Sequence, residues 1–209
     1  MVALRQAEDE ASMALLGCDF QRLAVPDCIY RGDPAAGRWY YNNDTELFGE
    51  VAPADLPLAG DIAQAIAGLT QPGPETTLYA PLTVGHHVDH QLTHLAAWQL
   101  RERGWPVVFY EEYPYVDSHY PFTRSPLGHD NAYTLAQTLA APPMSTFEPQ
   151  IRPLSEAALA VKVESIAAYA SQMGILFGSS AAMGQFVRAY SRQVGQGVPA
   201  ERVWLPTAY

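Results

Sequence analysis

Four of the six histidines of the chain lie in one short segment, which reads GHHVDHQLTH. His86, His90 and His94 are spaced four apart, and His87 and His90 are three apart, so their side chains can share one face of a helix. Imidazoles at this spacing are common zinc ligands, and a carboxylate such as Asp89 can orient a ligand from behind. A single histidine is more often a surface or capping residue, whereas a cluster of this kind indicates a metal-dependent site.

The pattern around this cluster places it between a strand and a helix. Residues 77–82 are strand-like, and residues 89–103 have the apolar spacing of a helix that Gly104 can end. In open α/β sheets, ligands bind at the carboxyl ends of the strands. The positive end of the helix also keeps imidazoles neutral, which is the form that binds a metal ion.

Strands and helices alternate over the first half of the chain, which predicts βαβ units and an α/β fold. The 209 residues suffice for one domain, residues 1–209. The chain begins inside a helical pattern, so we expect a Rossmann-like, mostly parallel sheet, flanked by helices, that lacks its first strand. The sheet edge left open would favour a homo-oligomer. Further helices are predicted over residues 4–15, 61–69, 155–173 and 181–192, and further strands over 20–25 and 106–110.

Composition excludes several classes of function. The net charge is −10 with only 12 Lys and Arg, which argues against a nucleic-acid partner. No run of about 18 apolar residues occurs, so no membrane span is expected. The first residues do not resemble an export signal, because Glu8, Asp9 and Glu10 interrupt the apolar pattern there. Cys18 and Cys28 could pair, but two free thiols in a reducing cytoplasm fit better.

Several segments, in this order along the chain, resemble motifs of the PIG-L/LmbE family of N-acetylglucosaminyl deacetylases. His87-Val88-Asp89-His90 resembles the HPDH motif of that family, with valine in place of proline. Other matching segments are RQAE at residues 5–8, VPD at 25–27, FYEEYPY at 109–115, and Lys162 with YASQ at 169–172. None of these is very specific, but their order and spacing together are.

The resemblance implies hydrolysis of an N-acetyl group, typically on a small sugar-linked substrate, with one zinc ion. It implies that His90 is a metal ligand, that His87 is the acid or electrophile, and that Asp89 orients His87. Arg5 and Asp27 would face the substrate. The residues themselves add Glu111, which ends a predicted strand and could bind substrate or orient a histidine, as could Glu112; a solvated strand end is equally consistent.

The chain departs from the family at one motif. No HPDD motif occurs, although in the family it supplies the other zinc ligands and the general base. We expect these groups in an upstream segment, so that the chain would be an N-terminally incomplete deacetylase domain and inactive alone. Two alternatives stay open. The chain could be a non-catalytic remnant that binds a ligand or partner, or a different metallohydrolase that uses His86, His90 and His94.

Overall fold

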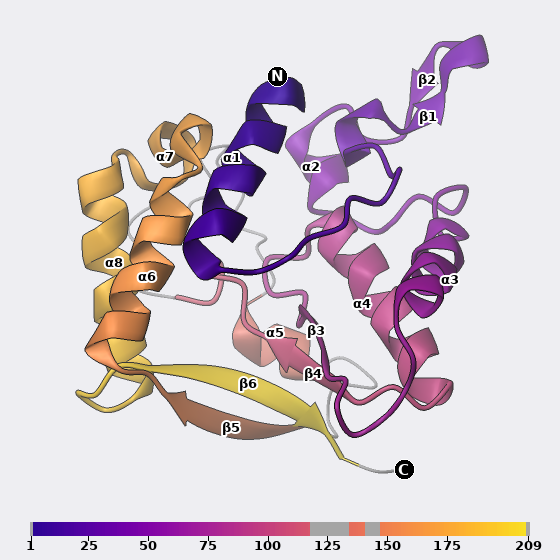
Figure 1. Ribbon diagram of the computed structural model, residues 1–209. Coiled ribbons are helices and arrows are strands. Elements are labelled where there is room, and N and C mark those ends of the chain that lie inside the picture. The colour runs from indigo at the N-terminus through magenta and orange to yellow at the C-terminus, as the bar shows by residue number, and fades with distance from the viewer. Residues whose placement is uncertain (1, 118–133, 141–146, 208–209) are drawn as a thin grey trace. The chain divides into compact units, whose positions relative to one another are not determined.

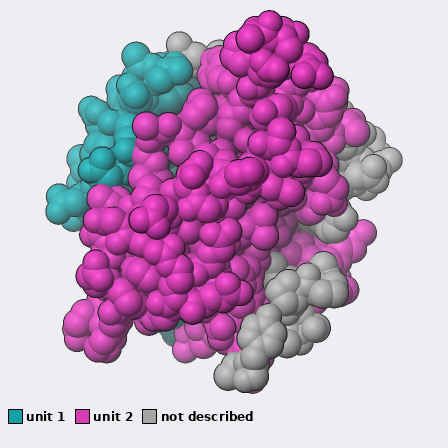
Figure 2. Space-filling model, turned by 90° about the vertical axis from the view of Figure 1, so that its right-hand side faces the viewer, with its two compact units in different colours: residues 1–22, 119–126, 151–202 teal, residues 23–118, 127–150, 203–209 magenta. Residues whose placement is uncertain are grey.

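The computed structural model describes residues 2–117, 134–140 and 147–207 (Figure 1). Two compact units can be distinguished in the chain, and each is described by itself (Figure 2). Unit 1 consists of residues 1–22, 119–126 and 151–202, and unit 2 of residues 23–118, 127–150 and 203–209. No helix among the described residues is both long enough and apolar enough to cross a membrane.

Unit 2 contains the histidine-rich segment and the elements around it. In chain order these are η1 (Cys28–Tyr30), β1 (Gly32–Asp33), η2 (Pro34–Ala36), β2 (Arg38–Trp39), α2 (Asp44–Leu47), α3 (Leu58–Leu69), β3 (Leu78–Pro81), α4 (Val88–Glu102), β4 (Val107–Tyr110) and α5 (Leu135–Ala140). Strands β5 (Phe147–Pro153) and β6 (Ala200–Pro206) each have residues in both units.

The main sheet has the strand order β3-β4-β6-β5. Strands β3 and β4 are parallel, with Leu78 opposite Val107, whereas β4 and β6 are antiparallel, with Phe109 opposite Trp204. The predicted α/β class is confirmed, and the sheet is mixed. The strand pattern over residues 77–82 and 106–110 predicted β3 and β4, but β5 and β6 were not predicted.

Helix α4 packs on α3 and on β3, and its buried residues include an apolar stripe. Val88, Leu92, Ala96 and Leu100 are four residues apart and almost wholly buried. At 3.6 residues per turn this spacing keeps one face of the helix against its neighbours. Leu92 and Val88 also join the buried cluster formed by Cys28, Tyr41, Val51 and Ala59. The burial of this stripe therefore fixes the orientation of α4, and with it the positions of the histidines in its first turn.

Unit 1 contains the helices α1 (Val2–Leu16), α6 (Glu156–Ala167), α7 (Ala170–Phe177) and α8 (Ser180–Val194). Helix α1 packs on α6 and α7, and α6 and α7 both pack on α8. The contact between α1 and α6 includes a buried hydrogen bond of 2.7 Å between the hydroxyls of Ser12 and Ser165. The predicted helices over residues 4–15 and 181–192 are confirmed as α1 and α8.

Two predicted elements differ from the structure. Residues 20–25 do not form a strand; their side chains are exposed or only half-buried, and the segment belongs to neither sheet of the described residues. The single helix predicted over residues 155–173 is interrupted after Ala167. In a continuous helix the Ser171 N–H would bond to the carbonyl of Ala167. Instead, it donates to the Glu8 carboxylate at 2.7 Å, and the Ser171 hydroxyl donates to the other oxygen at 2.7 Å.

Glu8 therefore caps α7 from another helix, and the hydrogen bond from the Ser171 backbone lowers its pKa. We expect Glu8→Ala to lower the Tm of the chain several times more than Glu10→Ala does. Glu10 lies on the same helix and only pairs with Arg22 at the surface, at 3.2 Å, and exposed pairs contribute little. Thermal melts followed by circular dichroism test this. Equal shifts in the two variants would contradict the capping role.

Candidate functional site

The loop between β3 and α4 has an unusual backbone that a buried carboxylate holds in place. Thr83, Gly85 and His86 all have positive φ angles, of 76°, 87° and 60°, and for the non-glycine residues this costs about 1–3 kcal/mol each. The Glu112 carboxylate accepts the backbone N–H groups of Thr83 at 2.7 Å and Val84 at 3.1 Å. This pair of hydrogen bonds ties the loop to the segment after β4.

His87 ends this loop and is the N-cap of α4. Its Nδ1 accepts the backbone N–H of Asp89 at 3.2 Å, and a neutral imidazole that accepts at Nδ1 carries its proton on Nε2. Burial and the neighbouring His90 lower the pKa of His87 to about 4. The ring also packs edge-on against Phe48, with centroids 5.4 Å apart. His87 is thus a neutral imidazole whose Nε2–H is a hydrogen-bond donor.

Asp89 is held by a buried arginine. Arg31 Nη1 lies 2.6 Å from Asp89 Oδ1, and Arg31 Nε lies 2.9 Å from Asp55 Oδ2. The Tyr41 hydroxyl donates to the same Asp55 oxygen at 2.8 Å. Burial acts to lower the pKa of Arg31, but the Asp89 and Asp55 carboxylates outweigh it and the pKa is raised. This network fixes the carboxylate of Asp89 in the first turn of α4, where a negative charge is favourable.

His90 lies one turn further along α4, with its ring 5.2 Å from that of His87. Its Nδ1 is 3.3 Å from Glu112 Oε1 and, among the described residues, forms no hydrogen bond of good geometry. The Glu112 side chain is only 4% exposed, and a buried carboxylate next to an imidazole favours a proton on the nitrogen that faces it. This orientation leaves Nε2 as the ring nitrogen that a ligand can approach.

One group of potential metal ligands is found among the described residues. Cys28, His87 and Asp89 offer ligand atoms that all lie within 4.8 Å of one another. Both cysteines are free, as expected, and Cys28 is buried. Burial, with the carboxylates of Asp89 and Asp27, raises the pKa of the Cys28 thiol, so the thiol stays protonated unless a cation binds. His90, the predicted ligand, is not in this group.

The other predicted site residues have different surroundings. Asp27 caps η1, where its Oδ1 accepts the Ile29 N–H at 3.3 Å, and its charge acts on the pKa of His87. Glu111 accepts the indole N–H of Trp204 at 2.8 Å, so its neighbour Glu112 is the carboxylate beside His90. Arg5 belongs to unit 1, where its guanidinium lies 5.8 Å from the ring centre of Tyr169.

His94 has a structural environment. Its Nδ1 pairs with the Pro81 carbonyl at 2.8 Å, and its Nε2 accepts the Trp98 indole N–H at 2.8 Å. Since the carbonyl can only accept, Nδ1 carries the proton. Both ring nitrogens are therefore occupied, and among the described residues His86 and His94 do not join His90 in a group of ligands. The alternative metal site built from these three histidines is not supported.

Sequence reasoning missed Cys28, Arg31 and Phe48 as neighbours of the histidines. They come from segments about forty to sixty residues upstream, and no local pattern links them to the cluster. The adjacent pair Glu111 and Glu112 did carry a signal, because side chains alternate along an extended chain and only one of the two could face the histidines. The choice between them depended on the structure.

The chain is similar in sequence and in structure to known deacetylases. No family model matches the chain. In sequence it is 32% identical over 125 residues to a 2'-N-acetylparomamine deacetylase of Niallia circulans, covering 59% of this chain and 44% of that protein. It is likewise 32% identical over 120 residues to a 2'-N-acetylparomamine deacetylase of Streptomyces fradiae, covering 56% of this chain and 39% of that protein. The chain thus matches less than half the length of either relative.

In structure the chain is similar to the zinc-inhibited form of teicoplanin deacetylase Orf2, with a TM-score of 0.71 and 23% identity over 97% of this chain and 73% of that one. It is also similar to the A40926 pseudoaglycone deacetylase Dbv21, with a TM-score of 0.64 and 21% identity over 99% of this chain and 72% of that one. At these identities the likeness establishes the fold. Together the comparisons confirm the predicted resemblance to deacetylases of the PIG-L/LmbE type.

The buried His94 makes the stability of the chain depend on pH. Burial lowers its pKa to about 4 in the folded state, against about 6.5 when unfolded. Between these values the unfolded state binds more protons, so the contribution of His94 is intact above pH 6.5 and falls by about 3 kcal/mol as the pH drops to 4. Urea unfolding at pH 7 and pH 4.5 should therefore show a smaller pH effect for His94→Gln than for the unaltered chain. The same pH effect in both would contradict this.

Proposed function

We propose that the protein, in its complete form, hydrolyses the N-acetyl group of an amino-sugar-type substrate with the help of one zinc ion, to which this chain contributes one ligand. The observation that carries this proposal is the pair formed by His87 and His90 at the start of α4. His87 offers a hydrogen from Nε2, while a buried carboxylate behind His90 leaves Nε2 of that ring available to a metal ion. One ring is thus prepared as a donor and the other as a ligand.

His90 meets the chemical requirements of a zinc ligand. A ligating imidazole usually donates its second N–H to a carboxylate, which fixes the tautomer and makes the ring a better ligand. The Glu112 carboxylate is the acidic group beside that nitrogen, 3.3 Å from Nδ1, and its position is set by the two backbone N–H groups it accepts. A zinc ion bound at His90 would lower the pKa of a water molecule and polarise the acetyl carbonyl.

His87 would act on the oxygen of the acetyl group. As the carbonyl is attacked, negative charge develops on this oxygen, and a fixed hydrogen-bond donor stabilises it more than it stabilises the substrate. The Nε2–H of His87 is such a donor, because the Asp89 backbone N–H occupies Nδ1. Asp89 contributes by holding the first turn of α4 in place, since its carboxylate is paired with Arg31.

The names of the relatives support the substrate class. The two curated relatives are deacetylases of 2'-N-acetylparomamine, and the structural neighbours are deacetylases named for teicoplanin and the A40926 pseudoaglycone. We infer a small molecule that bears an N-acetylated amino sugar. The acidic chain, with a net charge of −10, suits a substrate that also carries amino groups.

The three-residue group around Cys28 is the main competitor for the metal ion. A soft thiolate would hold zinc well, but in that site His87 would have to give up its Nδ1 hydrogen bond or its Nε2 proton. Asp89 would also have to serve the ion while paired with Arg31 at 2.6 Å. These costs favour His90 as the ligand.

Zinc content separates the two sites. We expect about one zinc per chain, by elemental analysis of the full-length protein, to be lost in His90→Ala and kept in Cys28→Ser. Cys18→Ser and His86→Asn are matched controls, because Cys18 is the exposed cysteine and asparagine tolerates the positive φ of residue 86. Loss of zinc in Cys28→Ser with retention in His90→Ala would assign the ion to the Cys28 group instead.

Activity tests the role of His87. Asparagine can still cap α4 but lacks the Nε2–H, so His87→Asn should keep the zinc ion and the fold while lowering kcat about 100-fold or more. Acetate release from an N-acetylated amino sugar measures this, with His86→Asn as the control. Wild-type activity in His87→Asn would remove His87 from the mechanism.

Glu112 should act through His90. We expect Glu112→Gln to weaken zinc binding about 10- to 100-fold, measured by competition with a chelator. Glu111→Gln is the matched control, because Glu111 is adjacent in sequence and bonds to Trp204 instead. Equal zinc affinities in the two variants, with intact circular dichroism spectra, would contradict the positioning role.

A further inference from the structure

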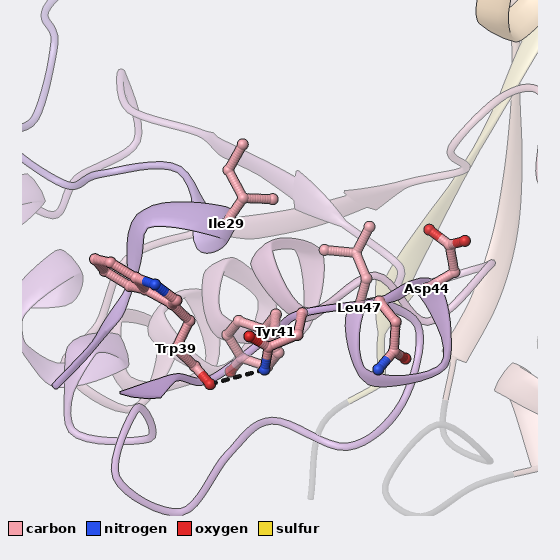
Figure 3. Close-up of a pocket in the computed structure, with 7 residues that line it drawn as sticks. Ile29, Trp39, Tyr41, Asp44 and Leu47 are labelled. Atoms are coloured by element: carbon pink, nitrogen blue, oxygen red, sulfur yellow. Dashed lines mark hydrogen bonds between the residues drawn. The ribbon is translucent and has the colours of Figure 1, made fainter. Parts of the chain in front are cut away.

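A pocket of about 340 Å³ lies in unit 2, on the segments that precede α3 (Figure 3). It is formed by η1, β2, the following residues and α2. Its lining residues are Ile29, Trp39, Tyr41, Asn42, Asn43, Asp44 and Leu47. Small-molecule sites usually measure about 300–1,000 Å³, so this volume suits one sugar ring rather than a large aglycone.

The apolar part of the pocket is open to solvent. The side chains of Trp39 and Ile29 are 43% and 45% exposed, although burial of such groups would be favourable. Tyr41, which lies between Trp39 and Leu47 in Figure 3, is buried, and its hydroxyl is bonded to Asp55. The pocket therefore has a fixed floor and an exposed indole on one side, and an indole face stacks well on the apolar face of a sugar.

Most polar groups of the pocket already have partners. The Asn42 amide donates to the Trp39 carbonyl at 3.0 Å and to Glu46 at 3.1 Å. Asn43 caps α2 by accepting the Glu46 N–H at 3.0 Å. The hydrogen bonds from Asn42 also lower the pKa of Glu46, which therefore stays ionised. The two asparagines are thus held in place. Among the lining residues the charge comes from Asp44, and Glu46 adds a second carboxylate next to Asn42.

The charge of the pocket is negative. Asp44 is half-buried, and the nearby cation on the β1–β2 hairpin, Arg38, is paired with Asp33 at 3.6 Å. With a net charge of −10 over the chain, the surroundings add to this potential. A protonated amine is the group that such a pocket favours, since it can pair with the Asp44 carboxylate.

Two chain segments connect the pocket to His87. Ile29 lines the pocket, and its neighbour Cys28 has its sulfur within 4.8 Å of the ligand atoms of His87 and Asp89. Leu47 lines the pocket, and its neighbour Phe48 packs against the His87 ring with centroids 5.4 Å apart. The pocket and the surroundings of His87 are therefore formed by neighbouring residues on each of these two segments.

We propose that this pocket binds a protonated amino-sugar ring of the substrate, adjacent to the sugar that is deacetylated at His87. The ring would stack on Trp39 and pair its ammonium group with Asp44. The assignment rests on the proposed function, and it names the part of the substrate that this protein selects. A neutral sugar of the same size would lose the ion pair and bind more weakly.

Binding can be tested without catalysis. We expect glucosamine, which is protonated at pH 6.5, to bind the full-length His87→Asn protein in saturation-transfer NMR titrations at least about tenfold more tightly than N-acetylglucosamine or glucose. Asp44→Asn and Trp39→Ala should each weaken glucosamine binding about tenfold, whereas Asp61→Asn, which changes an exposed carboxylate on α3, should not. Equal binding of the three sugars, or no effect of Asp44→Asn and Trp39→Ala, would overturn the proposal.

Kinetics then separate this proposal from the proposed function. Asp44→Asn and Trp39→Ala should raise KM about tenfold for an N-acetylated disaccharide that carries a free amine, and leave KM for N-acetylglucosamine unchanged. If acetate is released but both variants have the wild-type KM for the disaccharide, the pocket proposal fails while the deacetylase assignment stands. If glucosamine binding depends on Asp44 but no acetate is released from any substrate, the deacetylase assignment fails and the pocket remains a cationic-sugar site.

Discussion

The buried guanidinium of Arg31 is the interaction on which the rest of unit 2 depends. It joins Asp55, which precedes α3, to Asp89 in the first turn of α4, and it also donates to the Pro26 carbonyl at 3.2 Å. Removing one member of such a buried pair costs about 3–5 kcal/mol, because the partner charge is left without compensation. Three separate segments of the chain are therefore held at fixed positions by one side chain.

The consequences extend to both surfaces of functional interest. On one side, the fixed Asp89 keeps its backbone N–H directed at His87 Nδ1, and that hydrogen bond sets the tautomer of the imidazole. On the other side, Tyr41 shares Asp55 with Arg31 and forms the floor of the pocket. A polar network in the interior thus relates the reactive end of α4 to the Trp39 pocket, and this relation would be lost if the network were replaced by apolar side chains.

Sequence alone was sufficient where the signal was local. The helix over residues 89–103 and the strands before and after it have strong periodic patterns, and the histidines were correctly expected between a strand end and a helix start. Prediction from sequence failed where an element or a side chain depends on a contact with residues far away in the chain. Strand β6 has a short apolar pattern whose meaning depends on pairing with β4, and the predicted strand at residues 20–25 has a suitable composition but no neighbouring strand. The same holds for Cys28 and Arg31, whose importance comes from contacts with Asp89.

The carboxylate of Glu8 ends one helix and begins another across 163 positions of sequence. The start of α7 is therefore capped by a residue that lies far away in the sequence. During synthesis, Glu8 cannot accept these hydrogen bonds until Ser171 has also been synthesised. Contacts of such long range slow folding and lengthen the time during which partly folded chains can associate with one another.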